Sequence, residues 1–255
     1  MRTISRLVVT AVSLGAVSGC SVYEDMTTSG FAKQDSDAIV LAASKAMQDV
    51  TSMRLTGDVR DEGTQVFVDL RVDRGDDCIG TLRFGASNVD VRRVGGQAWV
   101  KGESGALNRL TGSTLPRQVL EQLSRKWMPV DGKEVDELCD FEELLETFEV
   151  VDFGEQGDTS GKSDKEKRGQ ARDDLAAAVP ATVVEESTMD GAKVVKLGGK
   201  PGGTHDEFTW VLSEAPHHVV KIESNDAQEG GILAFSEFNA DVEVEAPSDE
   251  DVFRA

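Results

Sequence analysis

The sequence predicts an α+β fold in which one curved antiparallel β-sheet is wrapped over helices. Apolar and polar residues alternate with a period of two in two separate blocks, residues 52–101 and 182–244. Helical patterns precede the first block and occupy the segment between the blocks. Glycines stand between several of the alternating runs, as expected for the turns of an antiparallel meander. These observations predict a single α+β domain over residues 36–255.

The clearest helix is predicted over residues 36–50. Its apolar residues recur at spacings of three and four, which places them in a single stripe. The stripe consists of Ile39, Ala42, Ala43, Ala46, Met47 and Val50. Asp35 or Ser36 is positioned to cap the N-terminus of this helix. Because half of the stripe is alanine, we expect the helix to pack closely on the sheet.

The alternating blocks predict the strands. The first block contains five runs, over residues 52–59, 65–72, 79–84, 89–94 and 97–101. One apolar and one polar face in such runs indicate a sheet with one side buried. The second block predicts strands over residues 182–186 and 193–197, followed by three apolar faces: Phe208, Trp210 and Leu212; His218, Val220 and Ile222; and Ile232, Ala234 and Phe238. Val242 and Val244 continue the alternation.

Two shorter helices and a polar segment are predicted between the blocks. Thr114 can cap a helix with Pro116 in its first turn and with Val119, Leu120, Leu123 and Trp127 on one side. Asp140 and Glu143 have the spacing of a capping box, followed by a short apolar face of Phe141, Leu144, Leu145 and Phe148. Residues 154–173 contain no large apolar side chain and predict a charged, flexible insertion.

Residues 1–19 are predicted to form a lipoprotein signal peptide. Arg2 and Arg6 precede an apolar stretch over residues 7–17, which is too short to span a bilayer. The stretch ends in Val17-Ser18-Gly19-Cys20, which resembles a bacterial lipobox, whose cysteine is acylated and becomes the first mature residue. An ordinary signal peptide with a chance cysteine is the alternative. We expect Cys20 to anchor the chain at the extracytoplasmic face of the cell membrane, and residues 20–35 to form a flexible tether.

The charge of the chain limits its partners. Its 255 residues include 47 acidic and 27 basic side chains, for a formal net charge of −20. Nucleic acid repels such a chain, so we expect no nucleic-acid partner. Anionic lipid head groups also repel it, so the acyl chains must supply the membrane affinity, at about 0.8 kcal/mol per buried CH₂. The sequence indicates no particular protein partner.

With Cys20 assigned to the anchor, Cys78 and Cys139 remain. Export places both cysteines in an oxidising compartment, where an even pair usually forms a disulfide. Two free buried thiols are the alternative. A metal site at these cysteines is disfavoured, because neither has a neighbouring His or second Cys in the sequence.

No motif in the sequence supports catalysis or a cofactor. Residues 157–163, GDTSGKS, look like a phosphate loop but have three residues between the glycines where the loop needs four. Ser104 lacks the glycine spacing of a nucleophile elbow. We therefore expect a protein that is not an enzyme and binds no cofactor.

No metal site is expected either. His217 and His218 are adjacent, so on a strand they would point to opposite faces. Asp73, Asp76 and Asp77 surround Gly75, but they lack the residue order of a calcium-binding loop. An ordinary turn rich in aspartate is the simpler interpretation.

The inner face of a strongly curved sheet must be filled by side chains or by a ligand. Val68 and Leu70 lie on one apolar strand face, and the three tryptophans are large enough to line or to fill a cavity. The candidate cavity-lining residues are therefore Val68, Leu70, Trp99, Trp127 and Trp210. Simple core filling is the alternative for each tryptophan.

Several short motifs resemble those of actinobacterial lipoproteins. The lipobox is one of these motifs. The others are residues 75–80 (GDDCIG), 94–101 (VGGQAWVK), 138–140 (LCD) and 235–238 (FSEF), and Ala246-Pro247 near the end. The chain is similar in these motifs to the LppX/LprG lipoproteins and to the LolA lipoprotein carriers. The resemblance implies a half-barrel of antiparallel strands over helices, a hydrophobic cavity for acyl chains, and pairing of Cys78 with Cys139. Residues 154–173 depart from it as an apparent insertion, and no lipid-contacting residue can be transferred.

Two functions follow from these expectations. The first is a membrane-anchored binding or carrier protein for a lipid or another apolar ligand, without catalysis. The second is an interaction or structural module of the cell envelope, with a packed core free of ligand and an acidic surface that meets a partner. An internal cavity would distinguish the first function from the second.

Overall fold

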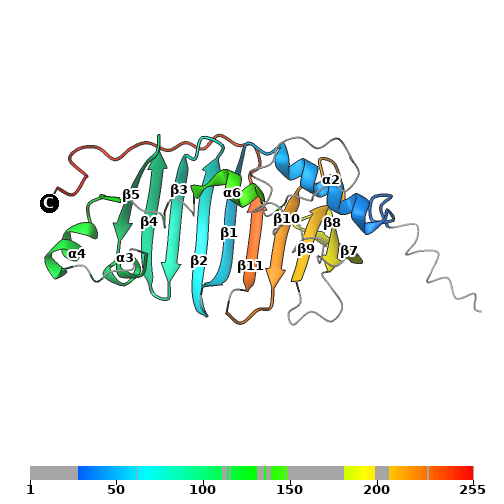
Figure 1. Cartoon of the computed structure of the whole chain (residues 1–255), viewed down its shortest axis with the longest axis horizontal. Helices are drawn as coiled ribbons and strands as arrows, with labels where there is room; N and C mark the ends of the chain where they lie inside the picture. The colour runs from blue at the N-terminus through cyan, green and yellow to red at the C-terminus, as the bar shows by residue number, and fades with distance from the viewer. Residues whose placement is uncertain are drawn as a thin grey trace, which may run out of the picture.

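The computed structural model describes residues 28–61, 63–110, 114, 116–130, 135, 139–146, 148, 181–198, 207–228 and 230–254. These residues form one open, entirely antiparallel sheet of 11 strands in the order β6-β5-β4-β3-β2-β1-β11-β10-β9-β8-β7. The strands stand side by side along the long axis of the molecule (Figure 1). The predicted α+β fold with one large antiparallel sheet is confirmed.

Both alternating blocks of the sequence contribute to this sheet. The first block forms β1 (Ser52–Asp61), β2 (Thr64–Asp73), β3 (Cys78–Phe84), β4 (Ser87–Val94) and β5 (Gln97–Gly102), which pair consecutively. The second forms β7 (Thr182–Met189), β8 (Ala192–Gly198), β9 (Glu207–Leu212), β10 (Val219–Ser224) and β11 (Gly231–Ser236). Pairing of β1 with β11 joins the two blocks, and the short β6 (Met128–Val130) extends the sheet beyond β5.

The helices cover one face of the sheet, which we call the inner face (Figure 1). They are α2 (Ser36–Gln48), α3 (Ser104–Leu110), α4 (Arg117–Leu123) and α6 (Phe141–Glu146). Ile39 and Met47 of α2, Leu107 of α3 and Phe141 of α6 are fully buried in one core cluster with the inner-face side chains of the strands. The predicted alanine-rich stripe of α2 therefore does face the sheet.

The helix ends agree with the sequence in part. The amide of Glu143 donates a hydrogen bond of 2.9 Å to Asp140 Oδ1, which confirms the predicted cap of α6. The N-cap of α4 is Pro116 rather than Thr114, and Trp127 lies beyond the end of that helix. Neither α3 nor β6 was predicted, because each is too short to show a period in the sequence.

Glycines allow the strands to approach closely on the inner face. Gly80 of β3 pairs with Leu70 of β2, and a Cβ atom at position 80 would collide with the backbone carbonyl of Asp69. Gly57 of β1 pairs with both Val68 and Leu233, and a Cβ atom there would collide with the carbonyl of Ile232. Such positions permit a sheet to bend, because only glycine avoids the collision.

The faces of β10 and β11 differ from the prediction. A bulge at Val220 shifts the register of β10, so Val219 and Ile222 both contact the core although their positions differ by an odd number, three. On β11, Leu233 and Phe235 face the core, whereas Ile232 is 43% exposed on the other face. The predicted face of Ile232 and Ala234 is thus the outer one.

Val242 and Val244 lie in no strand, which corrects the prediction for this segment. The chain after β11, residues 237–254, crosses the ends of β1 to β5 instead of running parallel to them (Figure 1). We call it the C-terminal strap. Arg92 Nη1 donates to the carbonyl of Glu245 at 3.2 Å, and Val252 forms a single parallel bridge with Trp127. An alternating pattern forms a strand only where a partner strand runs alongside it.

Of the helices formed by the described residues, none has the length and apolar character needed to cross a membrane.

Candidate functional site

A disulfide fixes the inner face to the helical layer. Cys78 begins β3, and Cys139 lies two residues before α6. The two cysteines are bonded, with Cα atoms 5.6 Å apart, and both are fully buried. This confirms the predicted pairing. The bond ties the segment just before α6 to the first residue of β3.

One part of the inner face is not covered by any of the described helices. Ile222, Leu233, Gly57 and Val68 are consecutive cross-strand partners from β10 to β2, and all four are half-buried. Val59, two residues after Gly57, is also half-buried. Figure 1 shows α2 and α6 near the upper ends of these strands, with α3 and α4 to one side. We call this region, Gly57, Val59, Val68, Ile222 and Leu233, the open inner face.

The open inner face is apolar in all its side chains. Gly57 has none, so the row of side chains is lowest there, between Leu233 and Val68. Leu70, two residues along β2, is 1% exposed and belongs to the packed part of the core. A surface of this kind attracts apolar groups without directional bonds, which suits a flexible chain better than a polar ligand.

The three tryptophans lie on the opposite, outer face. Trp99 pairs with Arg92, whereas its neighbour Val100 pairs with Val91 in the core. Each tryptophan is at most 7% exposed, yet none belongs to the core cluster. Val68 and Leu70 are therefore the only predicted cavity residues on the inner face. Trp99, Trp127 and Trp210 cannot line a cavity between the sheet and its helices.

Cations cover the rings of Trp127 and Trp210 on the outer face. The guanidinium carbon of Arg92 lies 4.5 Å from the ring centroid of Trp127, and Lys101 Nζ lies 4.7 Å from it. Lys221 Nζ lies 4.2 Å and Lys196 Nζ 5.0 Å from the ring of Trp210. The attraction between a cation and an aromatic face stabilises this arrangement. No pattern of side-chain types predicts these contacts between cations and rings, because the pairs depend on the sheet register.

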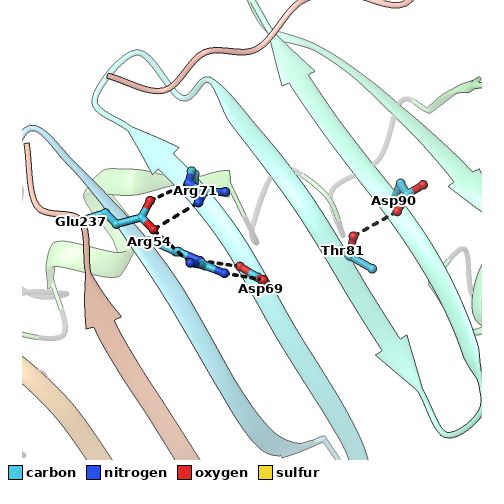
Figure 2. Close-up of polar contacts among 6 residues, drawn as sticks. All are labelled: Arg54, Asp69, Arg71, Thr81, Asp90 and Glu237. Carbon is cyan, nitrogen blue, oxygen red and sulfur yellow. Dashed lines mark hydrogen bonds and ion pairs between the residues drawn. The ribbon is translucent and has the colours of Figure 1, made fainter. Parts of the chain in front are cut away.

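A network of charged side chains crosses the outer face (Figure 2). Arg54 donates two hydrogen bonds of 2.8 Å to the carboxylate of Asp69 and one of 3.0 Å to Glu237 Oε1. Arg71 Nε donates to Glu237 Oε2 at 2.7 Å. Hydrogen bonding to Arg54 lowers the pKa of Asp69, and bonding to Arg71 and Arg54 lowers the pKa of Glu237. Since Glu237 follows β11 directly, the network fixes the start of the C-terminal strap.

The N-terminal segment docks at the other end of the sheet. The amide of Ser29 donates to Glu186 Oε2 of β7 at 2.9 Å. Phe31, 8% exposed, stacks on His217 with ring centroids 3.8 Å apart. The predicted flexible tether is therefore attached to the domain from Ser29 onward. Cys20 and the signal peptide lie outside the described residues.

The adjacent histidines, the aspartate turn and Ser104, which the sequence also offered as candidates, have structural roles. His217 Nδ1 lies 3.0 Å from the carbonyl of Leu212, while burial against Phe238 lowers the pKa of His218. Asp73 Oδ1 accepts hydrogen bonds from the amides of Gly75 and Asp77, which makes an ordinary aspartate turn. Ser104 is the first residue of α3.

Across the part of the chain that the structure describes, no three His, Cys, Asp or Glu side chains are grouped as metal ligands. The glycine-rich segment 157–163 and the predicted insertion 154–173 lie outside it.

The chain is similar to solved structures over most of its length. LprF from Mycobacterium bovis superposes with a TM-score of 0.52 at 13% identity, covering 84% of this chain and 97% of LprF. The lipoprotein LppX from Mycobacterium tuberculosis gives a TM-score of 0.47 at 16% identity, covering 82% of this chain and 97% of LppX. A LolA superfamily protein from Nitrosomonas europaea gives 0.23 at 10% identity, covering 87% and 98%.

The likeness to LprF shows a common fold. At 13% identity, the likeness shows the fold alone. No protein-family model matches the chain, and no curated protein matches its sequence.

Proposed function

We propose that this protein is a lipoprotein, anchored through Cys20 at the extracytoplasmic face of the cell membrane, that binds or carries a lipid with flexible acyl chains. The acyl chains lie on the open inner face, and no covalent chemistry takes place there. The observation that carries the proposal is the row Ile222, Leu233, Gly57 and Val68, which remains half-buried although the next inner-face residues Leu70 and Leu82 are each 1% exposed.

The chemistry of the row supports an apolar ligand. Burial of apolar surface contributes about 25 cal/mol per Å², so a ligand that covers these side chains gains affinity without polar contacts. The likeness to LprF concerns the fold and gives no information on the ligand. The ligand assignment therefore depends on the row itself.

Displacement of a fluorescent fatty acid by extracted envelope lipids tests this function. We expect saturable binding by the unmodified protein and a loss of at least about tenfold in affinity for Val68→Trp, whose indole would occupy the row next to Gly57. Ile232→Trp is the matched control, because it adds the same indole on the outer face of β11. The control should bind like the unmodified protein.

Equal binding by both variants would place the ligand elsewhere. Absence of saturable binding by the unmodified protein would overturn the carrier function and favour the packed envelope module. Native mass spectrometry of protein purified from its own host would reveal the class of any copurified lipid.

The anchor is tested separately. Cys20→Ala should abolish the hydrophobic mass increment and the partition of the protein into detergent. If this variant still matures and partitions like the wild type, Cys20 is not the anchor.

A further inference from the structure

The open inner face is bordered by polar side chains on the side of β9. Ile222 pairs with Thr209 of β9, and Ser224, two residues further along β10, pairs with Glu207. Thr209 also pairs with Leu197, which belongs to the core cluster, so this set of paired residues lies on the inner face. Thr209 and Ser224 are half-buried, and Glu207 is exposed. We call Thr209, Ser224 and Glu207 the polar flank.

The side of the open inner face toward β3 is apolar. Val68 pairs with Leu82 of β3, and Val59 pairs with Val66, which in turn pairs with Phe84. Leu82 and Val66 are buried, and Phe84 packs against the core. Six strands spaced about 4.8 Å apart run from β9 to β3, so roughly 24 Å separates the two sides. A ligand that lies across the strands therefore meets hydroxyls and a carboxylate at one end and apolar side chains at the other.

The basic side chains of the strands from β9 to β2 point away from the open inner face. They are Lys221 on β10, Arg54 and Arg60 on β1, and Arg71 on β2. Each lies an odd number of positions from an inner-face residue of its own strand, namely Ile222, Gly57 or Leu70, and therefore lies on the outer face. An anionic head group at the polar flank would meet the carboxylate of Glu207 without a compensating cation from these strands.

We propose that the polar flank is the head-group site for the lipid on the open inner face, and that it takes an uncharged head group bearing hydroxyls. The proposal rests on the proposed function, because it needs acyl chains on the open inner face. Ser224 Oγ accepts a hydrogen bond of 3.3 Å from the amide of Asp226, which leaves its O–H free to donate to the ligand. The hydroxyl of Thr209 can donate or accept, whereas the carboxylate of Glu207 only accepts.

These hydrogen-bonding roles distinguish classes of head group. A ligand hydroxyl can donate to Glu207 and accept from Ser224, so it satisfies both ends of the flank. An ionised phosphate or carboxylate has no proton for Glu207 and is repelled by it. The apolar side at β3 fixes the orientation, because the acyl chains gain more by covering Val68 and Leu82 than by covering hydroxyls.

Competition between ligands that share one acyl chain tests the proposal. The fluorescent fatty acid is bound to the full chain and displaced by monopalmitoylglycerol, by palmitoyl lysophosphatidic acid or by palmitoylcholine, each below its micellar concentration. The three head groups are an uncharged diol, an anion and a cation without a hydroxyl. We expect half-displacement by monopalmitoylglycerol at a concentration at least about threefold lower than by the lysophosphatidic acid. Palmitoylcholine should also be weaker than monopalmitoylglycerol.

Charge reversal places this selectivity on the polar flank. Glu207→Lys should make the lysophosphatidic acid the strongest of the three competitors. Glu185→Lys is the matched control, because Glu185 is exposed and pairs with Lys196 on the outer face of β7 and β8. The control should keep the order of the unmodified protein. Thr209→Val removes one hydroxyl and should reduce the advantage of monopalmitoylglycerol about twofold while leaving binding of the fluorescent fatty acid unchanged.

The outcomes separate the head-group site from the proposed function. Equal displacement by the three competitors, or strongest displacement by the lysophosphatidic acid, would overturn the proposal while saturable binding of the fluorescent fatty acid upholds the carrier function. Strongest displacement by palmitoylcholine would show that charge alone selects the head group. An unchanged order in Glu207→Lys would overturn the placement of the head group at the polar flank. Absence of saturable binding of the fatty acid would overturn both the carrier function and this site.

Discussion

The two faces of the sheet shield their apolar and aromatic side chains from water in different ways. On the inner face, side chains such as Leu70 and Val91 are buried by helices and by a disulfide-linked segment. On the outer face, aromatic rings are covered by cations from neighbouring strands, as when Arg83 lies 3.6 Å from the ring centroid of Phe67. Only the inner face excludes water through a second layer of structure. We therefore expect the inner face to contribute most of the stability and the outer face to tolerate change.

Of the changes that test this comparison, breaking the disulfide should lower the free energy of unfolding the most. The bond closes a loop between residues 61 positions apart, which predicts about 4 kcal/mol of stabilisation by the chain-entropy model. A double Cys78→Ser, Cys139→Ser variant should lose a large part of the free energy of unfolding, measured by urea denaturation. The tryptophan clusters of the outer face do not depend on the bond directly. A loss below about 1 kcal/mol would show that α6 stays on the inner face without it.

Truncation of one side chain on each face compares the faces directly. Leu70→Ala on β2 removes a fully buried side chain and should cost about 3 kcal/mol. Phe67→Ala, three residues earlier on the same strand, removes a half-buried ring on the outer face and its contact with Arg83. Its cost should be about 1 kcal/mol. Thermal unfolding of both variants measures the difference, and equal costs would contradict the comparison.

The sequence predicted the inner face of β2, because Val68 and Leu70 alternate there with polar residues and the strand pairs without a bulge. It failed on β10, where the bulge at Val220 places two residues of opposite parity on the same face. It also failed on the tryptophans. Their size suggested a cavity, but Trp99 and Trp210 are held on the outer face by their register, and the cations over Trp210 come from the neighbouring strands β8 and β10.

The disulfide and the α6 cap were predictable because each depends on few residues: two cysteines remaining after the anchor, and one Asp-x-x-Glu spacing. The open inner face was not predictable beyond Val68. Its members come from four strands, and its exposure depends on where the short helices stop. No local pattern in the sequence encodes either property.

The charged network on the outer face should give a small, pH-dependent effect. The folded-state pKa values of Asp69 and Glu237 are lowered, so their stabilisation is present above their ordinary pKa values of 3.8 and 4.5 and is lost as the pH falls further. Arg54→Met should reduce stability at pH 7 by less than about 1 kcal/mol, since Asp69 is half exposed. It should also flatten the fall of stability between pH 5 and about pH 3.

Urea denaturation between pH 5 and about pH 3 measures how steeply the free energy of unfolding falls with pH. Arg83→Met is the matched control, because Arg83 stacks on Phe67 and bonds to no carboxylate in the described chain. An unchanged slope in Arg54→Met would show that other carboxylates cause the acid sensitivity.

The smallest effect is expected for Ile232→Thr on β11. Ile232 is 43% exposed on the outer face, opposite Asp58 and Glu223, so its side chain gains little from the folded state. Threonine is β-branched and suits a strand, and the change in unfolding free energy should stay within about 0.5 kcal/mol. Leu233→Thr, one residue further, turns the same polar group toward the core and the open inner face. Because neighbouring residues on a strand point to opposite faces, this second variant should lose both stability and affinity for the fluorescent fatty acid. Similar results for the two variants would mean that the two faces of β11 are not distinct in solution, which would contradict the comparison.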